Sequence, residues 1–174
     1  MKHFNKFLFV FLLFAIISSV FAQKTEDNSA TQGFILKSVK PKFSITFPAS
    51  YKQEEHTVEN GLKTELYRAV KGDNVYMFKF TEHKNPAVSS DNKMYMEASL
   101  ESFVNGIQAD LIKKYDFKEK KQKGLEAFLK IPDKNLYVFY RVLIIKHVQY
   151  QIIVITKDMQ KSIEINKFFA SFSI

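Results

Sequence analysis

Cysteine is missing from this chain of 174 residues, and its absence removes several kinds of chemistry at once. Without a thiol there is no disulfide, iron–sulfur cluster, thiolate zinc site or cysteine nucleophile. The usual bacterial lipid anchor is attached to a cysteine, so we expect none here. Glycine is scarce as well: the five glycines are scattered singly, and no glycine-rich phosphate-binding loop can be recognised.

Arginine occurs only as Arg68 and Arg141, although the formal net charge is +8. The positive charge therefore comes almost entirely from lysine. Proteins that read nucleic-acid bases rely heavily on arginine, so the composition argues against a nucleic-acid partner.

Residues 1–22 have the composition of a secretory signal peptide. Lys2 and Lys6 give a positive start, residues 7–17 are apolar, and small residues precede a cleavage site after Ala22. The apolar stretch is shorter than the roughly 20 residues that span a bilayer, so an uncleaved anchor is the less favoured alternative. We expect a secreted protein, periplasmic or extracellular, with no transmembrane segment after cleavage.

The rest of the chain divides into two parts. Residues 23–33 are polar without apolar periodicity, and we predict a disordered N-terminal arm. Residues 34–174 are enough for one domain with a substantial core and too few for two.

Most of this domain shows the period of two that is typical of strands. Strands are predicted at 43–47, 51–59, 62–70, 75–83, 117–122, 125–131, 136–146 and 148–156. Asn60-Gly61 favours a tight hairpin turn. The last two strands are apolar on both faces, which is expected at the centre of a sheet.

Two segments have helical periodicity instead. A long helix is predicted from Lys93 to Lys114, with Asp91 as its N-cap. Its apolar stripe consists of Leu100, Phe103, Val104, Ile107 and Leu111.

A second helix is predicted at the C-terminus, from Met159 or Ile163 to Phe172. Its N-cap would be Asp158 or Ser162. Its apolar face consists of Ile165, Phe168, Phe169 and Phe172. Together these elements predict an α+β protein: an antiparallel sheet of about six to eight strands with one long helix and one C-terminal helix packed on it.

Certain segments resemble the PsbP-like (Mog1/PsbP) family over residues 34–174. They are "FSITFP" with the following "FPASY", the long apolar strand pair, and the closing "INKFFASFSI". The resemblance implies an accessory or binding module rather than an enzyme, and it carries over no catalytic residues. A cystatin-like sheet with a helix is the alternative fold.

Few residues are candidates for a catalytic or metal site. His56, His83 and His147 have no second ligand at suitable spacing along one element, and His147 falls where the last hairpin should turn. Glu97 and Glu101 share a helical face, where their charges would complement the helix dipole. The motif "SSDN" at 89–92 lacks the partner motifs of serine enzymes and indicates a loop before a helix cap. We therefore predict no catalytic, cofactor-binding or metal-binding residue and no cofactor.

The strongest surface feature is a run of lysines between residues 113 and 123. The lysines of this run are Lys113, Lys114, Lys118, Lys120, Lys121 and Lys123. Lysines of this kind commonly protect an edge strand from aggregation, which is the favoured interpretation. Peripheral contact with an anionic surface is the alternative.

These observations predict a secreted, non-enzymatic binding or accessory module of the bacterial cell envelope, with an envelope protein as its partner. The first alternative is a carrier or sensor of a small hydrophobic or anionic ligand. Such a ligand would lie between the sheet and the long helix, where a cavity is required. A small hydrolase-type enzyme is the least favoured alternative.

Overall fold

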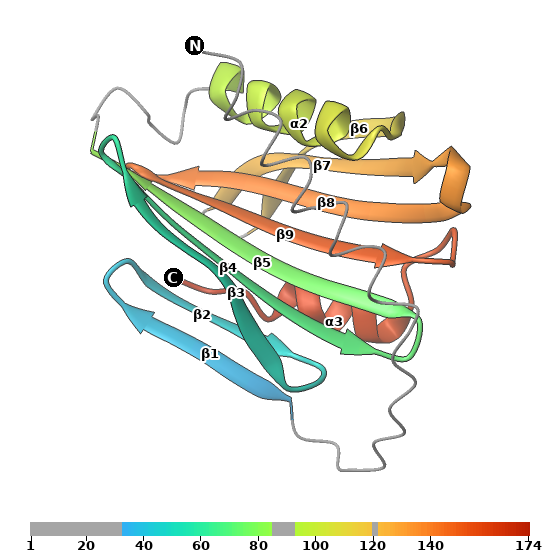
Figure 1. The fold of residues 1–174 in the computed structure, drawn as a ribbon, viewed down its shortest axis with the longest axis horizontal. Helices are drawn as coiled ribbons and strands as arrows, with labels where there is room; N and C mark the ends of the chain where they lie inside the picture. Colours follow the sequence, from blue (N-terminus) through green and yellow to red (C-terminus); the bar gives the residue numbers. More distant parts are fainter. Residues whose placement is uncertain (1–32, 85–92, 120–121) are drawn as a thin grey trace.

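The computed structural model describes residues 33–84, 93–119 and 122–174. Within these ranges the chain forms a seven-stranded sheet, a two-stranded sheet and two α-helices (Figure 1). The strands are β1 (Phe34–Val39), β2 (Lys42–Phe47), β3 (Tyr51–Glu59), β4 (Leu62–Lys71), β5 (Asn74–His83), β6 (Asp110–Glu119), β7 (Gln122–Ile131), β8 (Leu136–Ile145) and β9 (Val148–Thr156). The helices are α2 (Lys93–Ile107) and α3 (Ile163–Ala170), and a short 3₁₀ helix at Pro132–Lys134 joins β7 to β8. The predicted signal peptide, residues 23–32 of the predicted arm, Asp91 and the "SSDN" segment lie outside the described residues.

The seven-stranded sheet is antiparallel throughout, in the order β3-β4-β5-β9-β8-β7-β6. The two long apolar strands are β8 and β9, and β9 is the middle strand. Every residue of β8 from Leu136 to Ile144 is buried, because both faces of the sheet are covered there. The prediction of two central strands is confirmed.

The hairpin predicted at Asn60-Gly61 is also present and joins β3 to β4. Both residues have positive φ, 51° at Asn60 and 79° at Gly61. These are the left-handed conformations that a tight hairpin turn requires and that asparagine and glycine tolerate best.

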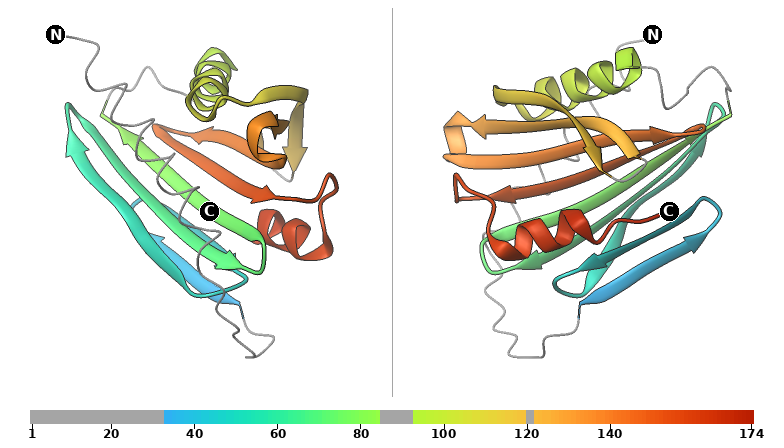
Figure 2. Two further views of the ribbon diagram at one scale, coloured as in Figure 1. Left: turned by 45° about the vertical axis from the view of Figure 1, so that its right-hand side comes forward. Right: turned by 180° about the vertical axis from the view of Figure 1, so that it is seen from behind.

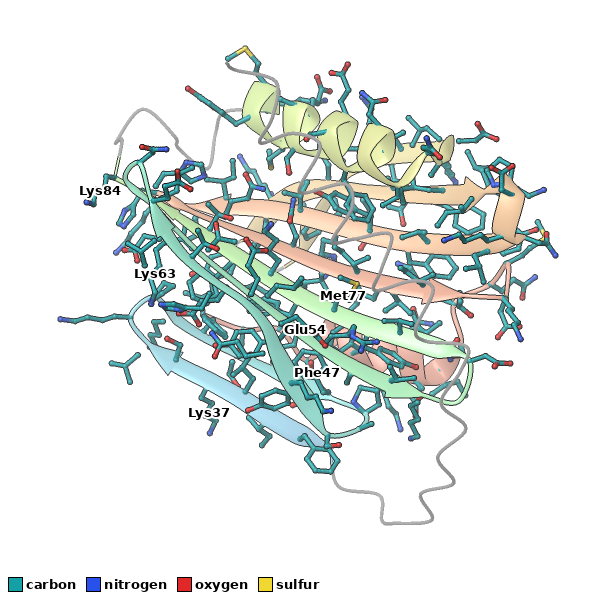
Figure 3. The ribbon with its side chains drawn as sticks, in the orientation of Figure 1. Lys37, Phe47, Glu54, Lys63, Met77 and Lys84 are labelled. Atoms are coloured by element: carbon teal, nitrogen blue, oxygen red, sulfur yellow. The ribbon has the colours of Figure 1, made fainter. Side chains whose placement is uncertain are left out.

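Two apolar layers lie on opposite faces of the large sheet. On one face α2 packs mainly against β7 and β8, around Leu100 and Val138; we call this the α2 face. On the other, the α3 face, α3 and the β1–β2 hairpin cover an aromatic layer that includes Phe78. Figure 2 shows the two helices on opposite sides of the sheet. Figure 3 labels Met77 of the α2-face layer and Phe47 of the α3-face layer.

The C-terminal segment belongs to the core. Ser162 caps α3 by accepting a hydrogen bond from the backbone N–H of Ile165 (3.2 Å), so Ser162 is the N-cap and not Asp158. The helix ends at Ala170 rather than at Phe172, yet Phe172 is buried with the rings of α3. The chain end is held by two backbone hydrogen bonds of 2.9 Å between Ser44 and Ser173.

The prediction that the long helix reaches Lys114 is wrong. Helix α2 ends at Ile107, and Gln108 has a positive φ of 54°. The chain then enters β6 at Asp110, and Leu111 lies 47% exposed on that strand rather than on the helical stripe. A helix end is favoured here because Gly106 weakens the last turn, whereas the following residues gain backbone hydrogen bonds by pairing with β7.

The predicted boundary of the next hairpin is also wrong. Strand β7 begins at Gln122, and Gly124 lies within it, opposite Phe117 of β6. A Cβ atom at Gly124 would lie 2.4 Å from the Phe117 ring and 2.3 Å from the carbonyl oxygen of Val142. The glycine therefore permits close packing between strands, not a turn. Strand β1, which the sequence pattern did not predict, pairs with β2.

A candidate ligand-binding cleft

A cleft of about 280 Å³ lies between α2 and the part of the sheet that α2 leaves uncovered. Its size is close to the lower end of the roughly 300–1,000 Å³ that is usual for small-molecule sites. The lining residues come from five elements, and they are Glu55 of β3, Leu66 of β4, Met77, Lys79, Thr81 and His83 of β5, Tyr95, Ser99, Ser102 and Phe103 of α2, and Gln149, Gln151 and Ile153 of β9. This is the position that the ligand-carrier alternative requires.

The floor of the cleft changes from apolar to polar along strands β5 and β9, as their pairing shows. On β5, alternate side chains reach the α2 face, and Met77 is paired with Ile153 of β9 at the apolar end. The next pair along is Lys79 with Gln151, followed by Thr81 with Gln149. A ligand with an apolar part and a polar part would match this gradient.

The wall and the floor are joined by a hydrogen-bond network centred on Ser99 of α2. The side-chain amides of Gln149 and Gln151 both donate to Ser99 Oγ at 2.8 Å, and Gln151 also donates to the Tyr140 hydroxyl at 2.9 Å. Because a hydroxyl oxygen has two lone pairs, Ser99 can accept both amides, and its hydroxyl also shares a hydrogen bond of 3.1 Å with the hydroxyl of Tyr140.

Lys79 and Glu55 bring opposite charges to the cleft floor. Their side chains are only 13% and 18% exposed, and Lys79 Nζ lies 3.6 Å from a Glu55 carboxylate oxygen. Burial lowers the pKa of Lys79, while the negative charge of Glu55 acts in the opposite sense.

Two histidines that are far apart in the sequence meet at the polar end of the sheet. The backbone N–H of His83 donates to the carbonyl oxygen of His147 at 2.9 Å, and His147 lies in the β8–β9 turn, as predicted. The buried Nε2 atom of His83 has no hydrogen-bond partner among the described residues. Burial, together with the neighbouring His147, lowers the pKa of His83, so the imidazole is neutral near pH 7.

The other candidate residues of the sequence have ordinary surface contacts. The Nδ1 atom of His56 lies 3.3 Å from Oε1 of Glu65, and the His56 side chain is 55% exposed. Glu97 pairs with Lys114 of β6 at 3.2 Å, and Glu101 is exposed on α2. Within the described ranges, no group of three or more histidine, aspartate or glutamate side chains could hold a metal ion.

The lysine run lies at an edge of the sheet. Lys113, Lys114 and Lys118 are on β6, the last strand of the sheet, and Lys118 is paired with Lys123 of β7. The expectation of an edge strand is therefore confirmed for Lys113, Lys114 and Lys118, whereas Lys123 lies on the second strand of the sheet. Lys120 and Lys121 fall outside the described residues.

Sequence reasoning missed the polar lining of the cleft. A signal was available: Tyr76, Phe78 and Phe80 alternate along their strand and so share one face, which places Lys79 on the opposite face. Gln151 similarly interrupts an apolar strand. The sequence does not show that α2 leaves these positions uncovered, because that depends on how far the helix extends across the sheet.

A buried ionic cluster on the α3 face was also missed. Glu126 of β7 accepts hydrogen bonds from Arg141 Nε (2.7 Å), Lys161 (3.1 Å) and Tyr115. The Arg141 guanidinium also lies 4.3 Å from the centre of the Phe117 ring. Burial alone would raise the pKa of Glu126, but the Tyr115 hydrogen bond and the charges of Arg141 and Lys161 lower it. This cluster joins β6, β7, β8 and the segment before α3, and its role is structural.

An antiparallel sheet with a long helix on one face and a helix plus a hairpin on the other defines an α+β protein. The structure is similar to the solution structure of cyanobacterial PsbP (CyanoP) from Synechocystis sp. PCC 6803, with a TM-score of 0.58 and 12% sequence identity, over 87% of this chain and 98% of that one. The chain thus has a PsbP-like fold, as the sequence resemblance implied.

A protein structure from Bacteroides thetaiotaomicron VPI-5482 is less similar, with a TM-score of 0.44 and 12% identity over 82% of this chain and 48% of that one. No family model and no curated protein matches the sequence. Of the helices that the structure describes, none is both long and apolar enough to cross a membrane.

Proposed function

We propose that this protein is a secreted, non-enzymatic binding module of the bacterial cell envelope, and that it holds a small ligand in the cleft between α2 and the sheet. The observation that carries the proposal is the cleft itself, which combines an apolar end with a hydrogen-bonding end. Secretion rests on the composition of residues 1–22.

The hydrogen bonds of Ser99 favour a role in binding over a role as a nucleophile. A serine nucleophile needs a neighbouring base to remove its proton. Ser99 instead accepts from two glutamine amides and is hydrogen-bonded to Tyr140. These neutral groups hold α2 on the sheet and fix the orientation of both glutamines.

Native mass spectrometry of the mature protein, isolated from its own cell envelope under mild conditions, tests this proposal. We expect a fraction with the added mass of a small molecule. Ser102→Trp should abolish that fraction because Ser102 lines the cleft. Ala98→Trp, which adds the same side chain at an exposed position of α2, should retain it. The bare mass alone in every sample, with no thermal stabilisation by small-molecule extracts of the envelope, would contradict the proposal.

A second candidate function is docking of an envelope protein along β6. This strand has an unpaired edge because it is the last strand of the sheet. It exposes Leu111, Ile112 and Tyr115 beside Lys113 and Lys118. Apolar side chains between lysines on a free edge suit an extended partner segment that carries acidic residues.

Photo-cross-linking in living cells tests this second candidate. A photoreactive residue at Lys113 should cross-link one defined partner, and Lys113→Glu combined with Lys118→Glu should abolish the adduct obtained from a probe at Ile112. A probe at the exposed Lys52 on β3, the opposite edge of the sheet, serves as the control. Equal cross-linking from both edges would count against docking at β6.

A further inference from the structure

The charged pair in the cleft indicates the chemical class of the ligand. Glu55 of β3 and Lys79 of β5 lie on either side of Leu66, which pairs with both of them across β4. Their 3.6 Å separation is longer than the roughly 2.7–2.9 Å of a close charge-assisted hydrogen bond. The two opposite charges lie close together on the floor of the cleft, and both side chains line it.

A mostly buried ion pair contributes little net stability to a fold. Removing both charges from water is costly, and the attraction between them repays that cost only when the geometry is close. The position of Glu55 and Lys79 in an open cleft, rather than in the sealed core, is consistent with a function in binding.

The balance of charge restricts what can bind there. A ligand with a single negative charge is attracted by Lys79 and repelled by Glu55, and a ligand with a single positive charge meets the reverse. A ligand with one charge of each sign gives each side chain an opposite partner and leaves the total charge of the cleft unchanged.

The neighbouring groups suit the rest of such a molecule. An apolar surface is provided by Phe103 of α2 together with Met77 and Ile153, the pair next to Lys79 and Gln151 on the same face of the sheet.

We propose that the cleft binds a small zwitterion with an apolar side group, of the free apolar amino acid class. The ligand carboxylate contacts Lys79, its ammonium contacts Glu55, and its side group lies against Met77, Ile153 and Phe103. This inference rests on the proposed function, because it assigns the ligand of the same cleft.

Calorimetric titration of the mature protein with matched probes tests the inference. The probes are L-leucine, L-methionine and L-phenylalanine, each compared with the analogue that lacks the ammonium and the analogue that lacks the carboxylate. For L-phenylalanine these are 3-phenylpropanoate and 2-phenylethylamine. We expect at least one amino acid to bind roughly tenfold or more tightly than both of its analogues, since a hydrogen bond to a charged group is lost in each.

Two substitutions separate the two contacts. Lys79→Gln should weaken binding of the amino acid and of the carboxylate analogue, and leave binding of the amine analogue unchanged or stronger. Glu55→Gln should weaken binding of the amino acid and of the amine analogue, and leave binding of the carboxylate analogue unchanged or stronger. Lys52→Gln and Glu59→Gln remove the same charges from exposed positions of β3 outside the cleft, and should change nothing.

The outcomes distinguish this inference from the proposed function. If no amino acid binds more tightly than its analogues, or if Lys79→Gln and Glu55→Gln affect all probes equally, the zwitterion inference is wrong. A small-molecule adduct that Ser102→Trp abolishes would still support the cleft as a binding site in that case. If no adduct is found either, both proposals fail.

Discussion

Replacing Phe168 tests directly how strongly the C-terminal segment stabilises the fold. Phe168 is 2% exposed. Its ring centre lies 5.2 Å from those of Phe47 and Tyr76 and 6.1 Å from that of Phe169. Phe168→Ala therefore removes a ring from a closed aromatic layer, and substitutions of this kind cost about 3–5 kcal/mol.

Urea unfolding followed by far-ultraviolet circular dichroism measures this loss. With a slope of about 1–3 kcal/mol per M, a loss of about 3–5 kcal/mol should lower the urea midpoint by roughly 1–5 M. Ile163→Ala is the matched control, because Ile163 belongs to the same helix and is 76% exposed. Its effect should stay within about 0.5 kcal/mol.

Deletion of residues 168–174 extends the same argument. It removes three buried phenylalanines and the backbone pairing of Ser173 with Ser44. At about 3 kcal/mol or more for each ring, the loss is about 9 kcal/mol, comparable with the ~5–15 kcal/mol that stabilises a whole domain. The truncated chain should show no cooperative transition. The reasoning is refuted if the truncated chain melts as the full one does, or if Phe168→Ala is no more harmful than Ile163→Ala.

Three further predictions concern other parts of the molecule. Glu126→Gln should destabilise the protein by about 3–5 kcal/mol at pH 7 because it breaks a buried ionic cluster. The pKa of Glu126 lies below its ordinary value of 4.5, so the unmodified protein should lose this stabilisation as the pH falls below about 4.5, whereas the variant should not. Urea unfolding at several pH values measures this difference. If the unfolding free energies of the two proteins change with pH in parallel, the prediction is wrong. Gly61→Ala should lower the free energy of unfolding by about 1 kcal/mol because φ is positive at this position. Gly106→Ala in α2 should raise it by about 0.5–1 kcal/mol in the same assay, because the added Cβ meets no atom within 4 Å. Expressed in a bacterial host, the protein should be recovered from the periplasm or medium with Gln23 as its first residue, and a cytoplasmic full-length chain would contradict cleavage after Ala22.

The local elements of the fold could be predicted because each is encoded by neighbouring residues. Asn60-Gly61 defines a turn by its backbone conformation, and Ile165, Phe168 and Phe169 share a face because a helix repeats every 3.6 residues. The end of α2 was mispredicted because Leu111 fits the helical stripe and equally suits a strand. Only pairing with β7 decides between them, and that partner lies beyond the next turn.

By itself, then, the sequence determined the order and type of most elements, the central position of β8 and β9, and the burial of the final phenylalanines. These properties follow from periodicity and from the free energy of removing apolar surface from water. Tertiary structure alone decided that Glu55 and Lys79 share a cleft. Their proximity depends on the register of three strands and on how far α2 extends across the sheet, and neither is encoded in residues that are neighbours in the chain.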